Sequence, residues 1–273
     1  MTAQATATTI EDVLIQLEEI ITTAEKEKES IGYFAALYHR VTLKVKEDLD
    51  AGLFKNGSRL ANLDVLFANR YIFAAREWKK NPNSLLISKS WKIAFENLSG
   101  SSNLVLHHLL LGMNAHINFD LGIAVVEAAK NGGNMNDFRR DYNAINNILA
   151  ALTYSIFNKL NLISPFLSVI GFTGTKSNSM LVQFSLGNAR DGAWGFATDL
   201  YTKSGDDYLN FITARDSTIE DLGKLIVQRK GLMKIGIFLI HLFEWKKPDR
   251  IIEVLYEHRK KYYKKEELNT IAG

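Results

Sequence analysis

The segment from Leu104 to Ala129 constrains the fold more than any other part of the chain. It is apolar on nearly every side of the helix that it would form. Such a helix is stable only when other helices bury it all round. The sequence therefore predicts a central helix over 103–130, with a bundle of further helices packed around it.

The rest of the chain also carries helical patterns. No alternation of apolar and polar residues, the sign of a half-buried strand, extends beyond a few residues. The three prolines, Pro82, Pro165 and Pro248, each stand where a helical pattern stops, because proline interrupts a helix. We predict one all-α domain over 1–273, a bundle of about ten helices, with flexible ends at 1–8 and 265–273.

Short connections rich in Gly, Ser and Asn separate the predicted helices. Two pairs have the spacing of capping boxes that begin a helix: Thr9 with Asp12, and Ser217 with Glu220. The expected helices lie at about 9–25, 29–50, 59–80, 86–98, 103–130, 136–160, 181–203, 217–230, 232–245 and 248–264.

Composition excludes several classes of function. The chain has no cysteine, so disulfides, thiolate chemistry and Cys-ligated metal sites are excluded. A formal net charge of +3 is too small to indicate a nucleic-acid partner. The N-terminus lacks the apolar core of a signal peptide. The apolar run from Leu232 to Trp245 is shorter than the roughly 20 residues of a membrane span. We expect a cytoplasmic protein without nucleic-acid partner or membrane span.

The polar residues of the central helix are the first candidates for a site. Stepped at about 100° per residue, they form two rows. His116 and Asp120 lie one turn apart, so their side chains reach one point, and a buried carboxylate is costly unless it is paired or bound to a metal. The first row holds His107, Asn114 and Asn118; the second holds His116, Asp120 and Glu127, with His108 beside them.

Three interpretations of His116 and Asp120 compete. They form a structural pair, a metal site completed by a neighbouring helix, or a metal-free acid–base pair. The spacing His-x-x-x-Asp alone is a weak signal. We favour a metal-free site, because an arginine such as Arg190 would compete with a metal for the same carboxylates.

Other helices place charges on apolar faces in the same way. Asp141 shares a stripe with Ile145 and Ile148, and Asp64 shares one with Phe67 and Tyr71. Arg190 needs a carboxylate partner, for which Asp120, Asp141 and Asp64 are the candidates. We predict that His116, Asp120, Asp141 and Arg190 converge in one internal pocket as catalytic residues. The surrounding ligand-binding residues would be Asp64, Arg70, His107, His108, Asn114 and Trp194.

Glycines inside helical patterns are a second sign of close packing. Each costs about 1 kcal/mol relative to alanine, so helices cross closely there or leave space for a ligand, and we favour close crossing. They are Gly112, Gly122, Gly187, Gly192 and Gly195.

The stretch Leu111-Gly-Met-Asn-Ala-His-Ile-Asn-Phe-Asp-Leu-Gly122 resembles the signature of a bacterial family of domains of unknown function. Leu66-Phe-Ala-Asn-Arg-Tyr71, Asp141 with Asn146-Asn147-Ile-Leu149, and Arg190 with Ala193-Trp194 resemble its weaker motifs. The resemblance covers about 30–250. It implies a helical fold and a shared site built from these segments, without an assigned activity.

Ionisable residues in an apolar setting favour an enzyme, because perturbed pKa values gather at functional sites. The leading hypothesis is an enzyme that acts on a small, largely apolar molecule by hydrolytic or lyase-type chemistry. The alternatives are a non-catalytic carrier or sensor of a lipid-like ligand, with Arg190 holding a carboxylate head group, and a structural helical protein. The sequence identifies no cofactor and does not define the oligomeric state.

Overall fold

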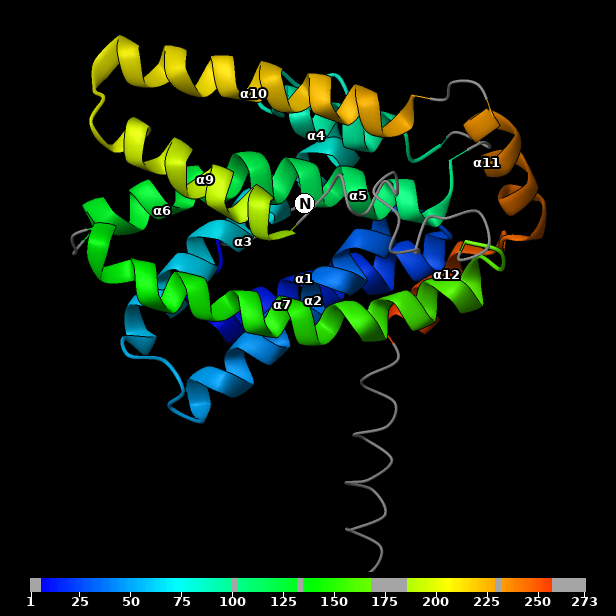
Figure 1. Ribbon diagram of the computed structural model, residues 1–273, viewed down its shortest axis with the longest axis horizontal. Coiled ribbons are helices and arrows are strands. Elements are labelled where there is room, and N and C mark those ends of the chain that lie inside the picture. The colour runs from blue at the N-terminus through cyan, green and yellow to red at the C-terminus, as the bar shows by residue number, and fades with distance from the viewer. Residues whose placement is uncertain (1–5, 100–102, 132–134, 168–185, 229–231, 257–273) are drawn as a thin grey trace, which may run out of the picture.

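The computed structural model describes residues 6–99, 103–131, 135–167, 186–228 and 232–256. Within these residues the chain is helical and contains no strand, which confirms the predicted all-α class (Figure 1). The α-helices are α1 Ile10–Glu27, α2 Ile31–Asp50, α3 Gly57–Lys80, α4 Lys89–Glu96, α5 Val105–Ala115, α6 Leu121–Lys130, α7 Met135–Ile163, α9 Leu186–Tyr201, α10 Gly205–Val227, α11 Leu232–Phe243 and α12 Pro248–Tyr256. A π-helical segment, η1 His116–Asp120, joins α5 to α6.

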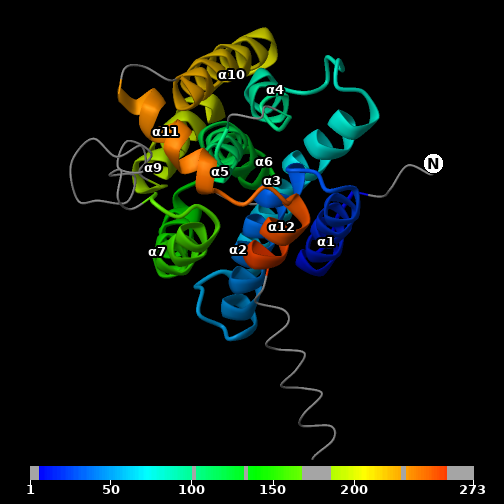
Figure 2. The ribbon, with the colours of Figure 1, turned by 90° about the vertical axis from the view of Figure 1, so that its right-hand side faces the viewer.

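The rod formed by α5, η1 and α6 is the central helix that the sequence predicted. Seen nearly end-on, it lies in the middle of the other helices (Figure 2). This rod, Val105–Lys130, is the one described helix that is long and apolar enough to cross a membrane. Its most apolar part is 94% buried inside the protein, as expected of a helix that forms the core of a bundle.

Two apolar cores surround the two halves of the rod. The first lies around α5 and draws on α1, α2, α3, α4 and α12. The second lies around α6 and draws on η1, α7 and α9. Close helix crossings occur at two of the glycines that the sequence indicated, Gly112 and Gly122, but not at Gly195, where a Cβ would meet no atom within 4 Å. A Cβ added at Gly112 would lie 2.5 Å from the Phe34 ring, and one at Gly122 would lie 2.4 Å from Phe196.

The first predicted capping box is confirmed and the second is wrong. The Thr9 hydroxyl accepts from the Asp12 N–H, and the Asp12 carboxylate accepts from the Thr9 N–H. Ser217, by contrast, lies inside α10, which begins at Gly205. The polar residues there serve another helix, since the Asp216 carboxylate accepts from the N–H groups of Lys89 and Ser90 at the start of α4.

The chain is packed into the fold from an earlier residue than the sequence predicted. Ala7 is buried, and its backbone N–H and carbonyl both bond to the Asn69 side chain on α3. The expected flexible segment 1–8 therefore does not extend to Ala7. Residues 1–5 and the expected flexible end 265–273 lie outside the described residues.

Candidate functional site

The candidate site is built on a break in the helical register of the central rod. Over His116–Asp120 the backbone is π-helical, and the N–H of Leu121 bonds to the His116 carbonyl, five residues earlier. A π turn of this kind holds one more residue than an α turn and frequently marks a functional site. The turn lies inside the motif by which the sequence resembled a known family.

Asp120 is the centre of the site. Its side chain is 2% exposed and accepts from three elements. Trp91 Nε1 on α4 donates to Oδ2 over 2.7 Å, and Arg70 Nε on α3 donates to Oδ1 over 2.9 Å. His116 Nδ1 lies 3.3 Å from Oδ2. Both carboxylate oxygens are therefore satisfied, which allows a charge to be kept at this depth.

Aromatic rings enclose the imidazole of His116. Phe67 stacks on it with ring centroids 3.5 Å apart, and Tyr38 meets it edge-on at 4.5 Å. Burial lowers the pKa of His116, although the neighbouring Asp120 opposes this shift. His116 is therefore neutral near pH 7. The bond to Asp120 assigns its proton to Nδ1, which leaves the lone pair on Nε2, and that buried atom has no hydrogen-bond partner.

Arg70 links the buried carboxylate to the surface. Its Nη1 lies 3.6 Å from Oε1 of Glu127, whose side chain is 39% exposed. Burial raises the pKa of Glu127, and the Arg70 charge opposes this shift. Arg70 also lies 5.9 Å from the Phe119 ring centroid. The site thus contains one cation shared by two acids, with the solvent-facing acid at its outer end.

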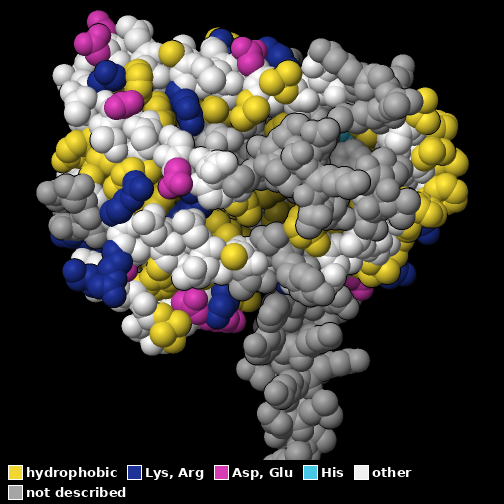
Figure 3. Space-filling view, viewed as in Figure 1, with side chains coloured by type: hydrophobic (Ala, Val, Ile, Leu, Met, Phe, Trp, Pro, Cys, Tyr) yellow, Lys and Arg dark blue, Asp and Glu magenta, His cyan; other side chains and the backbone are white. Residues whose placement is uncertain are grey.

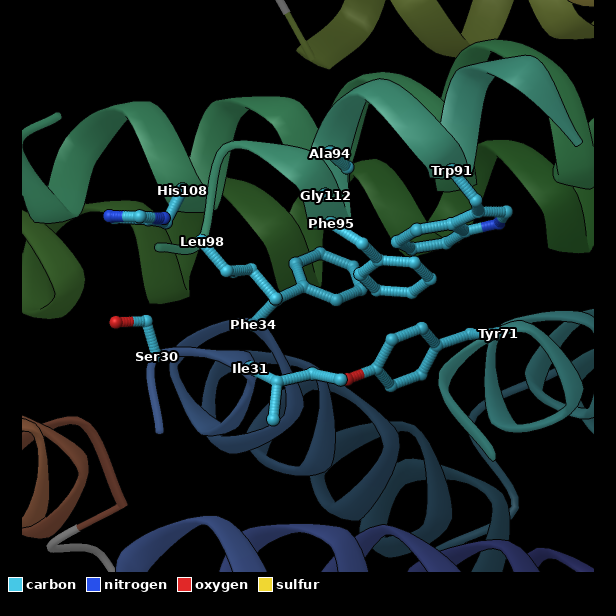
Figure 4. A pocket seen from close by; sticks show the side chains of 10 residues that line it. All are labelled: Ser30, Ile31, Phe34, Tyr71, Trp91, Ala94, Phe95, Leu98, His108 and Gly112. Atoms are coloured by element: carbon cyan, nitrogen blue, oxygen red, sulfur yellow. The ribbon is translucent and has the colours of Figure 1, made fainter. Parts of the chain in front are cut away.

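A narrow pocket of about 10 Å³, room for about one water molecule, lies beside this pair, between α2, α3, α4 and α5 (Figure 4). Phe34, Tyr71 and Trp91 form the wall between it and His116, with ring centroids 5.8, 6.1 and 6.0 Å from the imidazole. The Trp91 nitrogen points away from the pocket in Figure 4 and bonds to Asp120. The pocket is lined by Ser30, Ile31, Phe34, Tyr71, Trp91, Ala94, Phe95, Leu98, His108 and Gly112.

Two polar atoms of the pocket lining have no hydrogen-bond partner. They are the Tyr71 hydroxyl and His108 Nδ1, both buried. Figure 4 shows His108 at one end of the lining and Tyr71 toward the other. Burial lowers the pKa of His108 to about 4, so its ring is neutral near pH 7. An apolar lining with a few placed polar groups has the chemical character of a small-molecule site, and a molecule larger than water would enter this pocket only after a lining side chain moves.

Asp64 lies near the site but is not bonded to it. Its buried Oδ2 has no hydrogen-bond partner, and burial raises its pKa to about 7. Burial also raises the pKa of the Tyr38 phenol, which the Asp64 charge raises further. Asp64 is therefore linked to the site through Tyr38, whose ring contacts His116.

Asp141 has a structural role that the sequence did not predict. Its two oxygens accept from the backbone N–H groups of Lys55 and Asn56, over 2.9 and 2.8 Å. It thereby fixes the turn that leads into α3, where Asn56 is the N-cap. The sequence predicted Asp141 as a catalytic residue in one pocket with His116 and Asp120, whereas its hydrogen bonds are those of a residue that fixes a turn.

Arg190 is bound by α7, apart from both Asp120 and Asp141. Its Nε donates to Asn146 Oδ1 over 2.6 Å, and its Nη2 donates to the Tyr142 carbonyl over 2.5 Å. The guanidinium lies 4.1 Å from the Tyr142 ring centroid, and that ring packs on Trp194. The predicted pairing of Arg190 with Asp120 or Asp141 is therefore wrong. Arg190 donates its hydrogen bonds to α7, and the arginine that pairs with Asp120 is Arg70.

The remaining polar residues of the rod serve the packing of helices. Asn114 donates to the Ile219 carbonyl on α10 over 2.9 Å, and Asn118 donates to Asn114. His107 Nδ1 accepts from the Leu104 N–H at the start of α5. Asn114 therefore joins the rod to α10, and His107 caps the start of α5.

The sequence missed three members of the site: Trp91, Tyr38 and Phe67. Phe67 lies in the motif Leu66–Tyr71 together with Arg70, so that motif was a usable signal. Trp91 gave no signal, because the sequence does not show that α4 packs over the π turn. Within the described ranges, no three His, Asp or Glu side chains are placed to share a metal ion.

Among known protein families, one matches the chain. A family model described as a family of unknown function, DUF5995, matches residues 10–229. The match contains α1 to α7, α9 and α10, and with them every residue of the site. No curated protein and no solved structure matches the chain.

Proposed function

The chain belongs to DUF5995, a family of unknown function, and we propose that it binds a small, largely apolar molecule and acts on it with His116 as acid–base group. The pocket supports the first part. Its walls are Ile31, Phe34, Phe95 and other apolar groups, and two residues of its lining, Tyr71 and His108, carry polar atoms without a hydrogen-bond partner. Such polar atoms gain hydrogen bonds when a molecule with a polar group enters.

The unpartnered Nε2 of His116 is the observation that carries the catalytic part. Asp120, itself fixed by Arg70 and Trp91, holds the ring in one orientation and stabilises the imidazolium that forms when Nε2 takes a proton. Nε2 removes a proton from a substrate C–H group or from an attacking water. It then returns that proton to the leaving group, which is the proton balance of a lyase or a hydrolase.

One observation favours a non-catalytic carrier as the second candidate. Phe34, Tyr71 and Trp91 stand between the pocket and His116. A ligand reaches Nε2 only after one of these rings turns. If the wall stays closed, the protein holds the molecule without changing it.

The first prediction tests binding and chemistry together. Molecules that copurify with the full chain are extracted and identified by mass spectrometry. Ala94 lines the pocket, so Ala94→Leu fills it, and we expect the ligand to be lost. Ala214→Leu, at an exposed position of α10, is the matched control and should retain it. His116→Gln keeps the pocket but removes the base, so it should accumulate the unconverted substrate.

The outcomes separate the three candidates. Different molecules in the wild type and in His116→Gln support an enzyme. The same molecule in both supports a carrier. No molecule in any variant, with no thermal shift from added aromatic or aliphatic compounds, would leave the buried polar residues with a purely structural role. Far-ultraviolet circular dichroism checks that each variant is folded.

A further inference from the structure

Helix α11 exposes an apolar stripe to solvent. Ile235, Phe238, Leu239, Leu242 and Phe243 are between 46% and 64% exposed. Their spacing places them on one side of the helix, and Ile237 and Ile240 on the other side are at most 1% exposed. Figure 3 shows hydrophobic side chains gathered at the end of the molecule where α11 lies.

Aromatic residues extend this stripe at its C-terminal end. Phe166 is 46% exposed and packs on Phe243, with ring centroids 5.2 Å apart. Trp245 follows α11, is 36% exposed, and is tied to α7 through its N–H bond to the Ile163 carbonyl. These seven residues are called the α11 face below. Monomeric soluble proteins rarely leave so many large apolar side chains together in water.

Positive charge borders the α11 face. Lys246 and Lys247 follow Trp245 directly and are exposed, and Lys246 bonds to the His241 carbonyl at the end of α11. The acid on this stretch, Glu244, is turned inward, where it accepts from the Val105 N–H and the Ser164 hydroxyl. An outward apolar surface with a tryptophan and two lysines at its edge therefore faces the solvent without an exposed carboxylate among residues 235–247.

We infer that the α11 face docks on the surface of a bilayer that contains anionic lipids. Apolar and aromatic side chains of an interfacial helix enter the boundary between head groups and acyl chains, and lysines beside them pair with lipid phosphates. Tryptophan at the edge of the apolar surface suits this boundary. With 12 residues, α11 is too short to span a bilayer and would lie along its surface. This inference does not depend on the proposed enzymatic or carrier function.

Cosedimentation of the full chain with vesicles tests the inference. One set of vesicles contains equal parts of phosphatidylcholine and phosphatidylglycerol, and the other contains phosphatidylcholine alone. We expect binding to the anionic set, weakened by salt because ions screen the lysines. The fluorescence of Trp245 should shift to shorter wavelength as it leaves water.

Three variants make the test specific. Leu242→Glu should reduce binding at least about tenfold, since it replaces a large apolar side chain at the centre of the α11 face. Lys246→Glu with Lys247→Glu should reduce binding to the anionic vesicles by about tenfold or more. Leu85→Glu is the matched control: Leu85 is 95% exposed, lies in the loop before α4, and its change should leave binding unaltered.

Two results would overturn the inference. One is the absence of vesicle binding, or binding that Leu85→Glu reduces as much as Leu242→Glu does. The other is a concentration-dependent dimer in analytical ultracentrifugation that Leu242→Glu dissociates, which would make the α11 face a contact between two copies of the chain. Circular dichroism is expected to show the same helix content for all variants, because Leu242 is 61% exposed.

Discussion

At the scale of single residues, the interior holds several polar atoms whose hydrogen bonds are incomplete. Asp64 Oδ2, the Tyr71 hydroxyl, His108 Nδ1 and His116 Nε2 are buried without a partner. An unsatisfied buried polar group costs about 1–3 kcal/mol, so stability alone does not account for these four, and two of them, Tyr71 and His108, line the pocket. They are the residues whose properties should change most with pH and with ligand.

The second prediction concerns Asp64. Burial raises its pKa from 3.8 to about 7, so between these values the folded state holds a proton that the unfolded state has released. The stability from this group is therefore complete below about pH 4 and is lost as the pH rises to about 7. Asp64→Asn should gain about 1–3 kcal/mol over the wild type between pH 5 and 8, measured by urea unfolding. Asp207→Asn, at an exposed position, should differ from the wild type in free energy of unfolding by the same amount at every pH. The same pH-independent difference for Asp64→Asn would contradict the raised pKa of Asp64.

The pairing of His116 with Asp120 could be predicted from the sequence because both lie one turn apart on a helix that must be buried. The arginine could not be chosen in the same way. Arg70 and Arg190 both lie on partly apolar helices, and only the packing of α3 against α6 brings Arg70 to the carboxylate. Asp141 was misassigned because its partners are backbone N–H groups, and such donors leave no pattern in a sequence.

At the scale of elements, the periodicity of apolar residues predicted most of the helices, but it predicted their ends less accurately. The central rod was predicted as one helix over 103–130, and the structure divides it by the π turn at His116–Asp120. A wheel drawn at 100° per residue assumes one register throughout, so it misplaces residues beyond the turn. The start of α10 at Gly205 rather than at Ser217 has a different cause, because Asp216 and Ser217 look like a helix start but bond to α4.

The third prediction compares two helical glycines. A Cβ at Gly122 would lie 2.4 Å from Phe196 and 2.9 Å from the Ala193 carbonyl oxygen, where α6 crosses α9. Gly122→Ala should therefore lower the free energy of unfolding by about 1–3 kcal/mol, despite alanine's higher helix propensity. Gly195→Ala meets no atom within 4 Å and should raise it by about 0.5–1 kcal/mol. Equal effects of the two changes in urea unfolding would show that α6 and α9 do not cross so closely.

At the scale of the whole molecule, the folded unit extends past the part matched by the family model. The match ends at residue 229, but α12 packs on α1 and α2 and buries Ile251, Ile252 and Leu255. Gly32 on α2 makes room for Ile252, since a Cβ there would lie 2.6 Å from Ile252 Cδ1. Helix α12 therefore completes the core around α5 from outside the matched region.

The fourth prediction tests this closure. Ile252 is fully buried, so Ile252→Ala should lower the free energy of unfolding by about 2–4 kcal/mol. Arg250 on the same helix is 65% exposed and pairs with Glu253, so Arg250→Ala should change it by about 0.5 kcal/mol or less. Thermal unfolding followed by circular dichroism measures both. A small effect of Ile252→Ala would mean that α12 contributes little to the bundle.

Trp91 belongs to two structures at once, since its ring is a wall of the pocket and its Nε1–H bonds to Asp120. A ligand that displaces the ring changes the environment of Asp120 and, through it, the proton affinity of His116. Thermodynamic linkage is reciprocal: protonation of His116 must then alter the affinity for that ligand by the same factor. Proton and ligand would act as effectors of each other, with one indole transmitting the coupling.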